Sequence, residues 1–277
     1  MWEEALVGIQ KHLLTSTKHS NLQFIAELPQ GIGGTLSPKM DHLVCFLPGS
    51  IAIGATEGLT EKEARKRPGW NSWKEQQMQL ARELMKTCWA MYAVTDSGLS
   101  PEIAWFEVDE ADIRPSSRPS PTARSKDDKA SWERDLIIKP LDAHNLQRPE
   151  TVESLFLMYR VTNDPVYRKW GWEIFKAFKE HTVVKDGEGY TSLHDVTKVP
   201  TPQRDNMESF WLVRSSDLDL EFGSANSLQA ETLKYLYLLF SPREFLPLTE
   251  VVFNTEAHVL PRFNQSKFQT GWKRREL

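Results

Sequence analysis

Apolar side chains recur along this chain at intervals of three and four residues, the spacing that places them on one face of an α-helix. The pattern predicts amphipathic helices over residues 1–14 and 75–92. Cys88 shares the apolar stripe of the second helix, so we expect it to be buried. Strand patterns are few and short, at 21–28 and 189–193, and we interpret them as hairpin pieces at the ends of helices.

Three later segments differ in how much of the helix surface is apolar. Residues 149–162 and 232–240 are apolar around most of the circumference, whereas residues 167–180 carry lysine and arginine along one side. A helix that is apolar all round is buried, and a one-sided helix lies on the outside of the fold. Buried and peripheral helices in alternation predict an all-α fold with two concentric layers, either an α/α toroid or a solenoid.

Two segments interrupt the helical pattern. Residues 107–135 combine prolines, serines and mixed charge, which predicts a surface loop. Residues 213–229 are polar and separate two strongly apolar helical pieces. The length of 277 residues allows one large domain or two small ones, and we predict a single domain over residues 1–277.

Composition and charge exclude several classes of protein. Hydrophobic residues make up 40% and charged residues 26%, which is ordinary for a globular chain and argues against disorder. The net charge of −4 gives no electrostatic reason to expect a nucleic-acid partner. We expect no membrane segment, because no apolar stretch reaches the roughly 18 residues needed to cross a bilayer. The ten tryptophans either fill a large helical core or offer flat faces for stacking on sugars.

Candidate chemistry comes from carboxylates near predicted helix starts, namely Glu102, Glu150, Glu231 and Glu256. Taken singly, each is more often a helix cap, because the positive end of the helix dipole favours an anion. Taken together, carboxylates at the same ends of inner helices would converge in one acidic pocket. Such pockets hydrolyse glycosidic bonds or bind calcium.

Six sequence blocks resemble, in the same order, the class I α1,2-mannosidases of glycoside hydrolase family forty-seven. The blocks are MDHLVCFLPG (40–49), GLSPEI (98–103), HNLQRPETVESLFLMYRVT (144–162), DNMESFWL (205–212), ETLKYLYLLFS (231–241) and VVFNTEAH (251–258). The similarity extends over residues 1–263, and the RPETVES and FNTEAH motifs are close to diagnostic of the family.

The resemblance implies an (α/α)7 barrel with the active site at one end, present here as an incomplete C-terminal portion with a few short β-hairpins. It implies calcium-dependent hydrolysis of terminal α1,2-linked mannose from high-mannose N-glycans on glycoproteins, with inversion. Glu150 matches the general base that activates water, and Glu102 matches an active-site acid. Thr255 would hold Ca²⁺ through its hydroxyl and carbonyl oxygens, with waters completing the shell. Inverting hydrolysis needs two carboxyl groups roughly 6.5–9.5 Å apart.

Further residues match positions that line the family's mannose pocket. They are Asp41, His42, Arg148, Glu153, Phe210, Glu231 and Glu256. Arg148 would present its guanidinium as a fork to sugar or carboxylate oxygens. Considered alone, His42 would more often be a buried core histidine, and the Asn254-Thr255-Glu256 segment would be a helix cap.

The two cysteines, Cys45 and Cys88, admit two interpretations. From the residues alone, two separated cysteines in a cytosolic chain are usually free, buried thiols. The resemblance instead matches them to the family's disulfide, which needs an oxidising compartment. It therefore implies the secretory pathway, in the endoplasmic reticulum or Golgi or after secretion, and the Asn264 sequon agrees with that location.

The sequence also departs from the family pattern. It resembles the C-terminal part of a catalytic domain, and the upstream blocks with a general-acid glutamate and a catalytic aspartate have no counterpart here. We therefore expect this chain alone to be inactive and a full-length form to carry an N-terminal signal or anchor. Residues 213–229 fall inside a family block, which suggests a non-native insertion such as a translated intron. The alternatives are a non-catalytic mannose-binding relative and a helical interaction scaffold.

Overall fold

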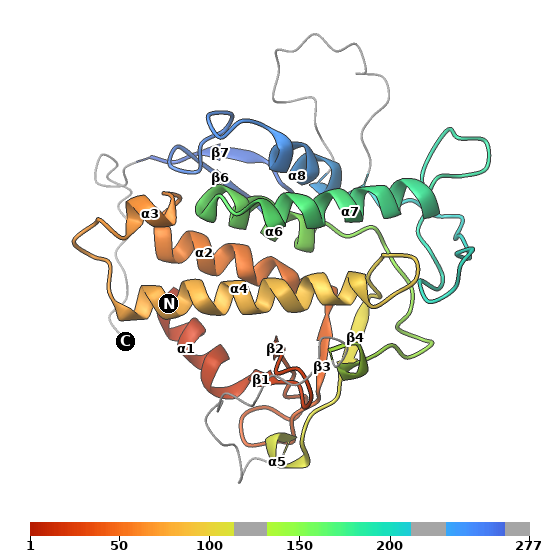
Figure 1. Cartoon of the computed structure of the whole chain (residues 1–277), viewed down its shortest axis with the longest axis horizontal. Coiled ribbons are helices and arrows are strands. Elements are labelled where there is room, and N and C mark those ends of the chain that lie inside the picture. The colour runs from red at the N-terminus through yellow and green to blue at the C-terminus, as the bar shows by residue number, and fades with distance from the viewer. Residues whose placement is uncertain (114–131, 212–230, 264–277) are drawn as a thin grey trace, which may run out of the picture.

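The computed structural model describes residues 1–113, 132–211 and 231–263, and these are mostly helical (Figure 1). The helices are α1 (Trp2–His12), η1 (His42–Phe46), α2 (Leu47–Thr56), α3 (Glu61–Ala64), α4 (Ser72–Ala93), α5 (Glu110–Ile113), η2 (Trp132–Asp135), α6 (Glu150–Thr162), α7 (Pro165–His181) and α8 (Glu231–Phe240), η1 and η2 being 3₁₀-helices. Every helix predicted from the apolar spacing is present, with its ends moved by a few residues.

Short antiparallel strands connect the helices. They are β1 (Leu14–Ser16), β2 (Gln23–Ile25), β3 (Lys39–Asp41), β4 (Ile103–Phe106), β5 (Leu136–Ile137), β6 (Val251–Phe253) and β7 (Val259–Pro261). They pair as β1–β2, as a β3–β4–β5 sheet and as the β6–β7 hairpin. The prediction for residues 21–28 is therefore confirmed, whereas residues 189–193 form only isolated bridges, such as the one between Val183 and Tyr190.

The core lies where α2, α4, α6 and α8 pack side by side, with α2 against α4 and α6, and α6 against α8. Figure 1 shows α7 running alongside α6 and α8. As predicted, α6 and α8 are buried on most sides, and α7 buries one face while Trp172 on its other face is 50% exposed. The fold is thus helical in two layers, with short strand pairs at the helix ends.

Local signals set the helix boundaries. The Asn71 side chain accepts a hydrogen bond from the Lys74 amide at the start of α4, and Asp164 accepts one from Val166 at the start of α7. Helix α6 ends at Asn163, whose backbone is left-handed. Its N-terminus differs, because Pro149 provides no side-chain cap. The first backbone amides of α6 therefore remain available to other groups.

The segment His42–Ala64, which comprises η1, α2 and α3, is long and apolar enough to cross a membrane by length and composition. This corrects the expectation that the chain contains no such stretch. Half of the apolar window is buried in the fold, and a buried core helix meets the same criterion. The Gly49 amide donates to Ser154 Oγ on α6 at 3.0 Å, and a Cβ there would lie 2.8 Å from Leu157. Packing against α6 thus accounts for its apolar character.

A disulfide joins Cys45 of η1 to Cys88 of α4, with a Cα–Cα distance of 5.8 Å. Both residues are buried. The pairing implied by the resemblance is confirmed, and the alternative of two free thiols is wrong. The bond fastens η1 to the middle of the core because Cys88 lies on the apolar stripe of α4, as its spacing predicted.

The two polar segments fall largely outside the described residues. Of residues 107–135, the structure describes the two ends, which form α5 and η2. At the second end, Asp135 is fully buried and accepts hydrogen bonds from Thr17 and from the His19 and Ser20 amides. The proposed insertion at 213–229 and the Asn264 sequon lie outside the described ranges, so both stay predictions.

Candidate active site

Carboxylates gather at the N-terminal ends of two neighbouring helices. Glu150 and Glu153 occupy the first turn of α6, and Glu231 is the first residue of α8. Because α6 and α8 pack against each other, the structure brings these three side chains into one region. The positive ends of both helix dipoles face it, which favours anions there.

Glu150 is held by a buried histidine. Its Oε2 lies 2.8 Å from Nδ1 of His42, a residue that is 2% exposed and begins η1. Burial opposes ionisation of Glu150, but the hydrogen bond and charge of His42 outweigh it and lower the pKa of the carboxyl. The His42 Nε2 lies 2.8 Å from the Tyr92 hydroxyl and 3.1 Å from that of Thr151, so the ring is fixed on both sides. Glu150 is therefore a positioned, ionised carboxylate.

The other two carboxyl groups behave in the opposite way. Burial raises the pKa of Glu153 to about 7, against a hydrogen bond donated by the Tyr235 hydroxyl at 3.2 Å, and the charges of Glu150 and Glu231 add to the rise. Burial and the charges of Glu150 and Glu256 likewise raise the pKa of Glu231 to about 7. One region thus holds an ionised carboxylate beside two carboxyls that are partly protonated near neutral pH.

Glu102 and Arg148 form an ion pair, with Arg148 Nε 2.5 Å from Glu102 Oε1. Glu102 immediately precedes β4, and its carbonyl accepts from the His42 amide at 2.8 Å, which places it beside the histidine. The Arg148 guanidinium lies 5.7 Å from the centre of the Phe210 ring. The Phe210 carbonyl accepts from the Glu231 amide at 2.9 Å. Backbone and side-chain contacts therefore connect Glu102, Arg148 and Phe210 to the carboxylate region.

The remaining predicted residues lie at the edge of this network. Asp41, the last residue of β3, has Oδ1 3.6 Å from Lys39 Nζ. Thr255 and Glu256 form the exposed tip of the β6–β7 hairpin. The charge of Glu256 contributes to the raised pKa of Glu231, so the tip lies within electrostatic reach of the site.

The metal implied by the resemblance is judged from the donors present. Within the described ranges, no three His, Cys, Asp or Glu side chains lie close enough to hold a metal. Thr255 offers a hydroxyl and a carbonyl oxygen at an exposed turn, next to Glu256, whose charge reaches Glu231. Oxygen donors with room for water suit a hard cation. The donor chemistry of Thr255 is thus compatible with a hard, largely hydrated cation.

Sequence reasoning missed four residues that support the site, namely Tyr92, Thr151, Lys234 and Tyr235. Tyr92 lies four residues after Cys88 on the same helix face, and Thr151 directly follows Glu150. Lys234 had the clearest signal, because it is the single charge inside an apolar helix. Its ammonium donates to the Ala257 carbonyl at 3.0 Å.

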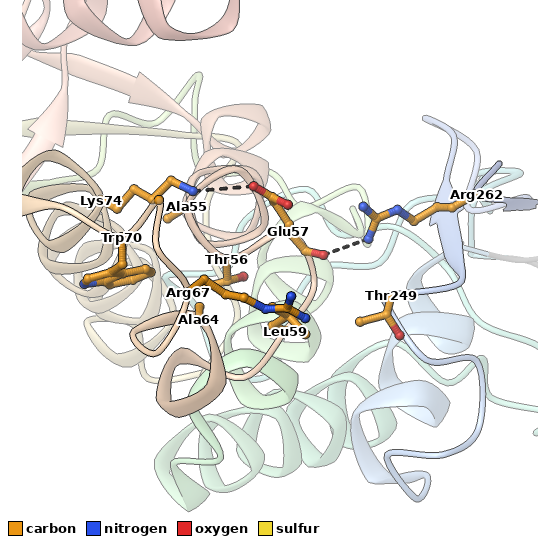
Figure 2. A pocket seen from close by; sticks show the side chains of 11 residues that line it. Ala55, Thr56, Glu57, Leu59, Ala64, Arg67, Trp70, Lys74, Thr249 and Arg262 are labelled. Carbon is orange, nitrogen blue, oxygen red and sulfur yellow. Dashed lines mark hydrogen bonds and ion pairs between the residues drawn. The ribbon is translucent and has the colours of Figure 1, made fainter. Parts of the chain in front are cut away.

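A separate pocket of about 320 Å³ lies at the other end of α2 (Figure 2). It is lined in part by Glu57, Arg67, Trp70, Lys74 and Arg262. None of the clustered carboxylates lines it. The pocket therefore belongs to the opposite end of the helical core from the candidate active site.

Comparison with curated proteins finds close sequence relatives. The chain is 47% identical over 284 residues to the mannosyl-oligosaccharide 1,2-alpha-mannosidase of Candida albicans, covering 99% of this chain and 44% of that protein. It is 43% identical over 260 residues to the human endoplasmic reticulum mannosyl-oligosaccharide 1,2-alpha-mannosidase, covering 93% of this chain and 30% of that protein. The chain spans less than half the length of these relatives.

Comparison with solved structures finds the alpha-1,2-mannosidase from Trichoderma reesei, with a TM-score of 0.69 and 26% sequence identity. The match covers 94% of this chain and 46% of that structure. The helices described above are accordingly those of an (α/α)7 barrel, as the sequence blocks implied. The family model of glycosyl hydrolase family 47 matches residues 1–262. With a match along nearly its whole length, this chain belongs to glycosyl hydrolase family 47.

Proposed function

We propose that the protein to which this chain belongs hydrolyses terminal α1,2-linked mannose from high-mannose N-glycans, with inversion and with calcium as cofactor. The observation that carries the proposal is the Glu150–His42 pair at the open N-terminus of α6, in a chain of this family. A carboxylate whose pKa is held low stays ionised at neutral pH and can accept a proton from water. Glu150 is thus suited to be the general base.

The surrounding groups suit the recognition of a sugar. Glu153 and Glu231, whose pKa values are about 7, can both donate and accept hydrogen bonds with hydroxyl groups. Arg148, held by Glu102, provides N–H donors beside the Phe210 ring, whose face can pack on the pyranose. Glu102 is the second proposed active-site acid, and its ion pair holds the Arg148 guanidinium in place. Asp41, His42 and Glu256 complete the proposed lining.

Thr255 would hold the calcium ion through its hydroxyl and carbonyl oxygens, with water filling the remaining positions. When bound, such an ion orients sugar hydroxyls and water and offsets negative charge. Among the residues described here, Glu153, Glu231 and Glu256 supply the negative charge that it would offset.

The compartment follows from the same reasoning. Relatives in human and in Saccharomyces cerevisiae are named endoplasmic reticulum enzymes. The Cys45–Cys88 disulfide needs an oxidising environment to form and persist. We therefore place this protein in the secretory pathway, with the endoplasmic reticulum as the first compartment to examine.

Release of mannose from a high-mannose N-glycan tests the proposal, using this chain and any longer form that its transcript encodes. We expect turnover only from a longer form, with β-mannose as the first product by NMR. Glu150→Gln should lower kcat by about 10²–10⁴-fold, whereas Glu188→Gln, at an exposed turn, should leave it unchanged. Glycan binding without turnover in a longer form would favour the mannose-binding alternative, and neither binding nor turnover would favour a scaffold.

A further inference from the structure

The β6–β7 hairpin carries Thr255 at a tightly organised turn. The Asn254 side-chain oxygen accepts from the amides of Glu256 at 3.0 Å and His258 at 2.8 Å, and the Asn254 carbonyl accepts from the Ala257 amide. These bonds fix the shape of the turn. They do not fix where the turn sits relative to α6 and α8, which carry the clustered carboxylates.

Two cationic side chains attach the hairpin to the rest of the fold through backbone carbonyls. At the base of the hairpin, Arg262 Nη1 donates to the carbonyls of Glu57 at 2.7 Å and Leu248 at 2.9 Å. Figure 2 shows the Arg262–Glu57 contact beside the Glu57–Lys74 pair. At the tip, Lys234 Nζ donates to the Ala257 carbonyl at 3.0 Å. The hairpin is therefore anchored at both ends by the same kind of hydrogen bond.

Burying the Lys234 ammonium at this position costs free energy. Lys234 is 6% exposed in an otherwise apolar helix, and burial lowers its pKa against the opposing charge of Glu231. A methionine or leucine would fill the space without the cost of burying a charge. What the lysine alone provides is a donor long enough to reach from α8 to the turn. Lys234 lies one helical turn after Glu231 on α8. The carbonyl that it binds belongs to Ala257, two residues after Thr255.

We propose that Lys234 is a positioning residue for the metal site, because it fixes the Ala257 turn and thereby the direction of the Thr255 oxygens relative to Glu231. This inference rests on the calcium site assigned under the proposed function. Two effects of Lys234 on a bound cation oppose each other. Its positive charge repels the ion and would weaken binding, whereas its hydrogen bond prearranges the donors and would strengthen binding.

Calcium titration by isothermal calorimetry separates the two effects, using the 277-residue chain and its Lys234→Met variant. Loss of a residue that orients a metal ligand costs about 10–100-fold in metal affinity, so we expect the Kd to rise by about that factor. If the charge dominated, the Kd would fall. An unchanged or lower Kd in Lys234→Met would overturn the inference.

Arg262→Met is the matched control, since it removes the equivalent contact at the base of the hairpin. We expect this variant to bind calcium nearly as tightly as the wild type. An equal loss of calcium affinity in both variants would mean that any loosening of the hairpin weakens binding. The inference that Lys234 specifically positions the Thr255 oxygens would then be wrong. If Lys234→Met does not fold, Lys234→Gln takes its place, because its shorter side chain cannot reach Ala257. A wild-type chain that binds no calcium contradicts the metal site itself.

Discussion

The two ends of helix α6 are both charged, but they differ in how the charge is compensated. At the N-terminal end, Glu150 and Glu153 share a region with Glu231, and two of the three carboxyls have pKa values of about 7. At the C-terminal end, Arg160 is 3% exposed and donates to the carbonyls of Leu238, Arg243 and Phe245. The charges at each end are opposite in sign to the partial charge of the helix dipole there, which favours them.

The difference lies in the partners. Arg160 binds the last turn of α8 and the connection that follows it through neutral carbonyl groups, so its charge stabilises the fold. At the other end, burial together with the neighbouring negative charges raises the pKa values of Glu153 and Glu231, so their ionised forms cost stability. The C-terminal end of α6 thus has a charge that stabilises the fold, and its N-terminal end carries the candidate active site. Removing charge should have opposite effects on stability at the two ends.

The largest effect should come from Arg160→Met. This substitution leaves one buried carbonyl, that of Leu238, and two partly buried ones without their donor, at roughly 1.5 kcal/mol or more for each bond to a charged group. We expect the free energy of unfolding to fall by about 4–5 kcal/mol, measured by urea denaturation. A loss below about 1 kcal/mol would show that water replaces the guanidinium and that this end is not structural.

Near the N-terminal end of α6, the Cys45–Cys88 disulfide stabilises the fold as Arg160 does at the other end. It fastens η1, and hence His42, to α4. It closes a loop with a sequence separation of 43 residues. Cys45→Ala combined with Cys88→Ala should lower the free energy of unfolding by about 4 kcal/mol, monitored by urea denaturation and circular dichroism. A single Cys45→Ala variant should lose as much stability as the double variant. A clearly smaller loss would contradict the explanation that the cross-link acts by restricting the unfolded chain.

Glu153→Gln should have the opposite sign. The raised pKa of Glu153 means that its contribution to stability is fully present below about pH 4.5 and is lost as the pH rises through about 7. Gln keeps an acceptor for Tyr235 without the charge, so at pH 8 the variant should be more stable than the wild type by about 1–3 kcal/mol. At pH 5 the difference should nearly vanish. Thermal unfolding at both values, in EDTA, measures it.

Exposed Glu180 on α7 provides the matched control for that experiment. Glu180→Gln removes the same charge on the outer layer of the fold and should change the stability little at either pH. Destabilisation by Glu153→Gln at pH 8 would mean that neither burial nor the neighbouring carboxylates penalise the charged form of Glu153, and the contrast between the ends of α6 would not hold.

The smallest effect on stability should come from replacing His42, whose contact lowers the pKa of Glu150. His42→Phe removes the donor to Glu150 while filling a similar volume, so the pKa of Glu150 should rise. In the wild type, the stability from this pair is present at neutral pH and is lost as the pH falls through the lowered pKa. In the variant that loss should begin at higher pH. Carboxyl ¹³C NMR of Glu150 follows the titration, and an unmoved midpoint would assign the low pKa to Arg148 or to the α6 amides.

Much of the fold follows directly from local patterns. The apolar spacing predicted α1, α4, α6, α7 and α8, and the contrast between all-round and one-sided helices predicted which are buried. Capping residues such as Asn71 and Asp164 account for where two of these helices begin. The short strands were less predictable, because two or three residues carry too little pattern and depend on their partners.

The site could be predicted only in part. Glu150 and Glu231 begin helices as the sequence predicted, whereas the prediction was wrong for Glu102, which precedes strand β4, and for Glu256, which lies at the tip of the β6–β7 hairpin. The family blocks gathered all four into one hypothesis. Their electrostatic division was not visible, because the pKa of Glu150 depends on His42, which is 108 residues away in the chain. Nor did any local pattern show that the unpaired charge of Lys234 reaches the Ala257 turn.

The sequence by itself therefore determined the helices, their buried faces and the candidate carboxylates, because these depend on side-chain spacing and residue type over a few turns. Tertiary structure alone decided which carboxyl is ionised, which are partly protonated and what holds the Thr255 hairpin in place. The physical reason is that pKa values and anchoring hydrogen bonds depend on burial and on distances of 3–4 Å between residues far apart in sequence. Such distances exist only once the helices have packed.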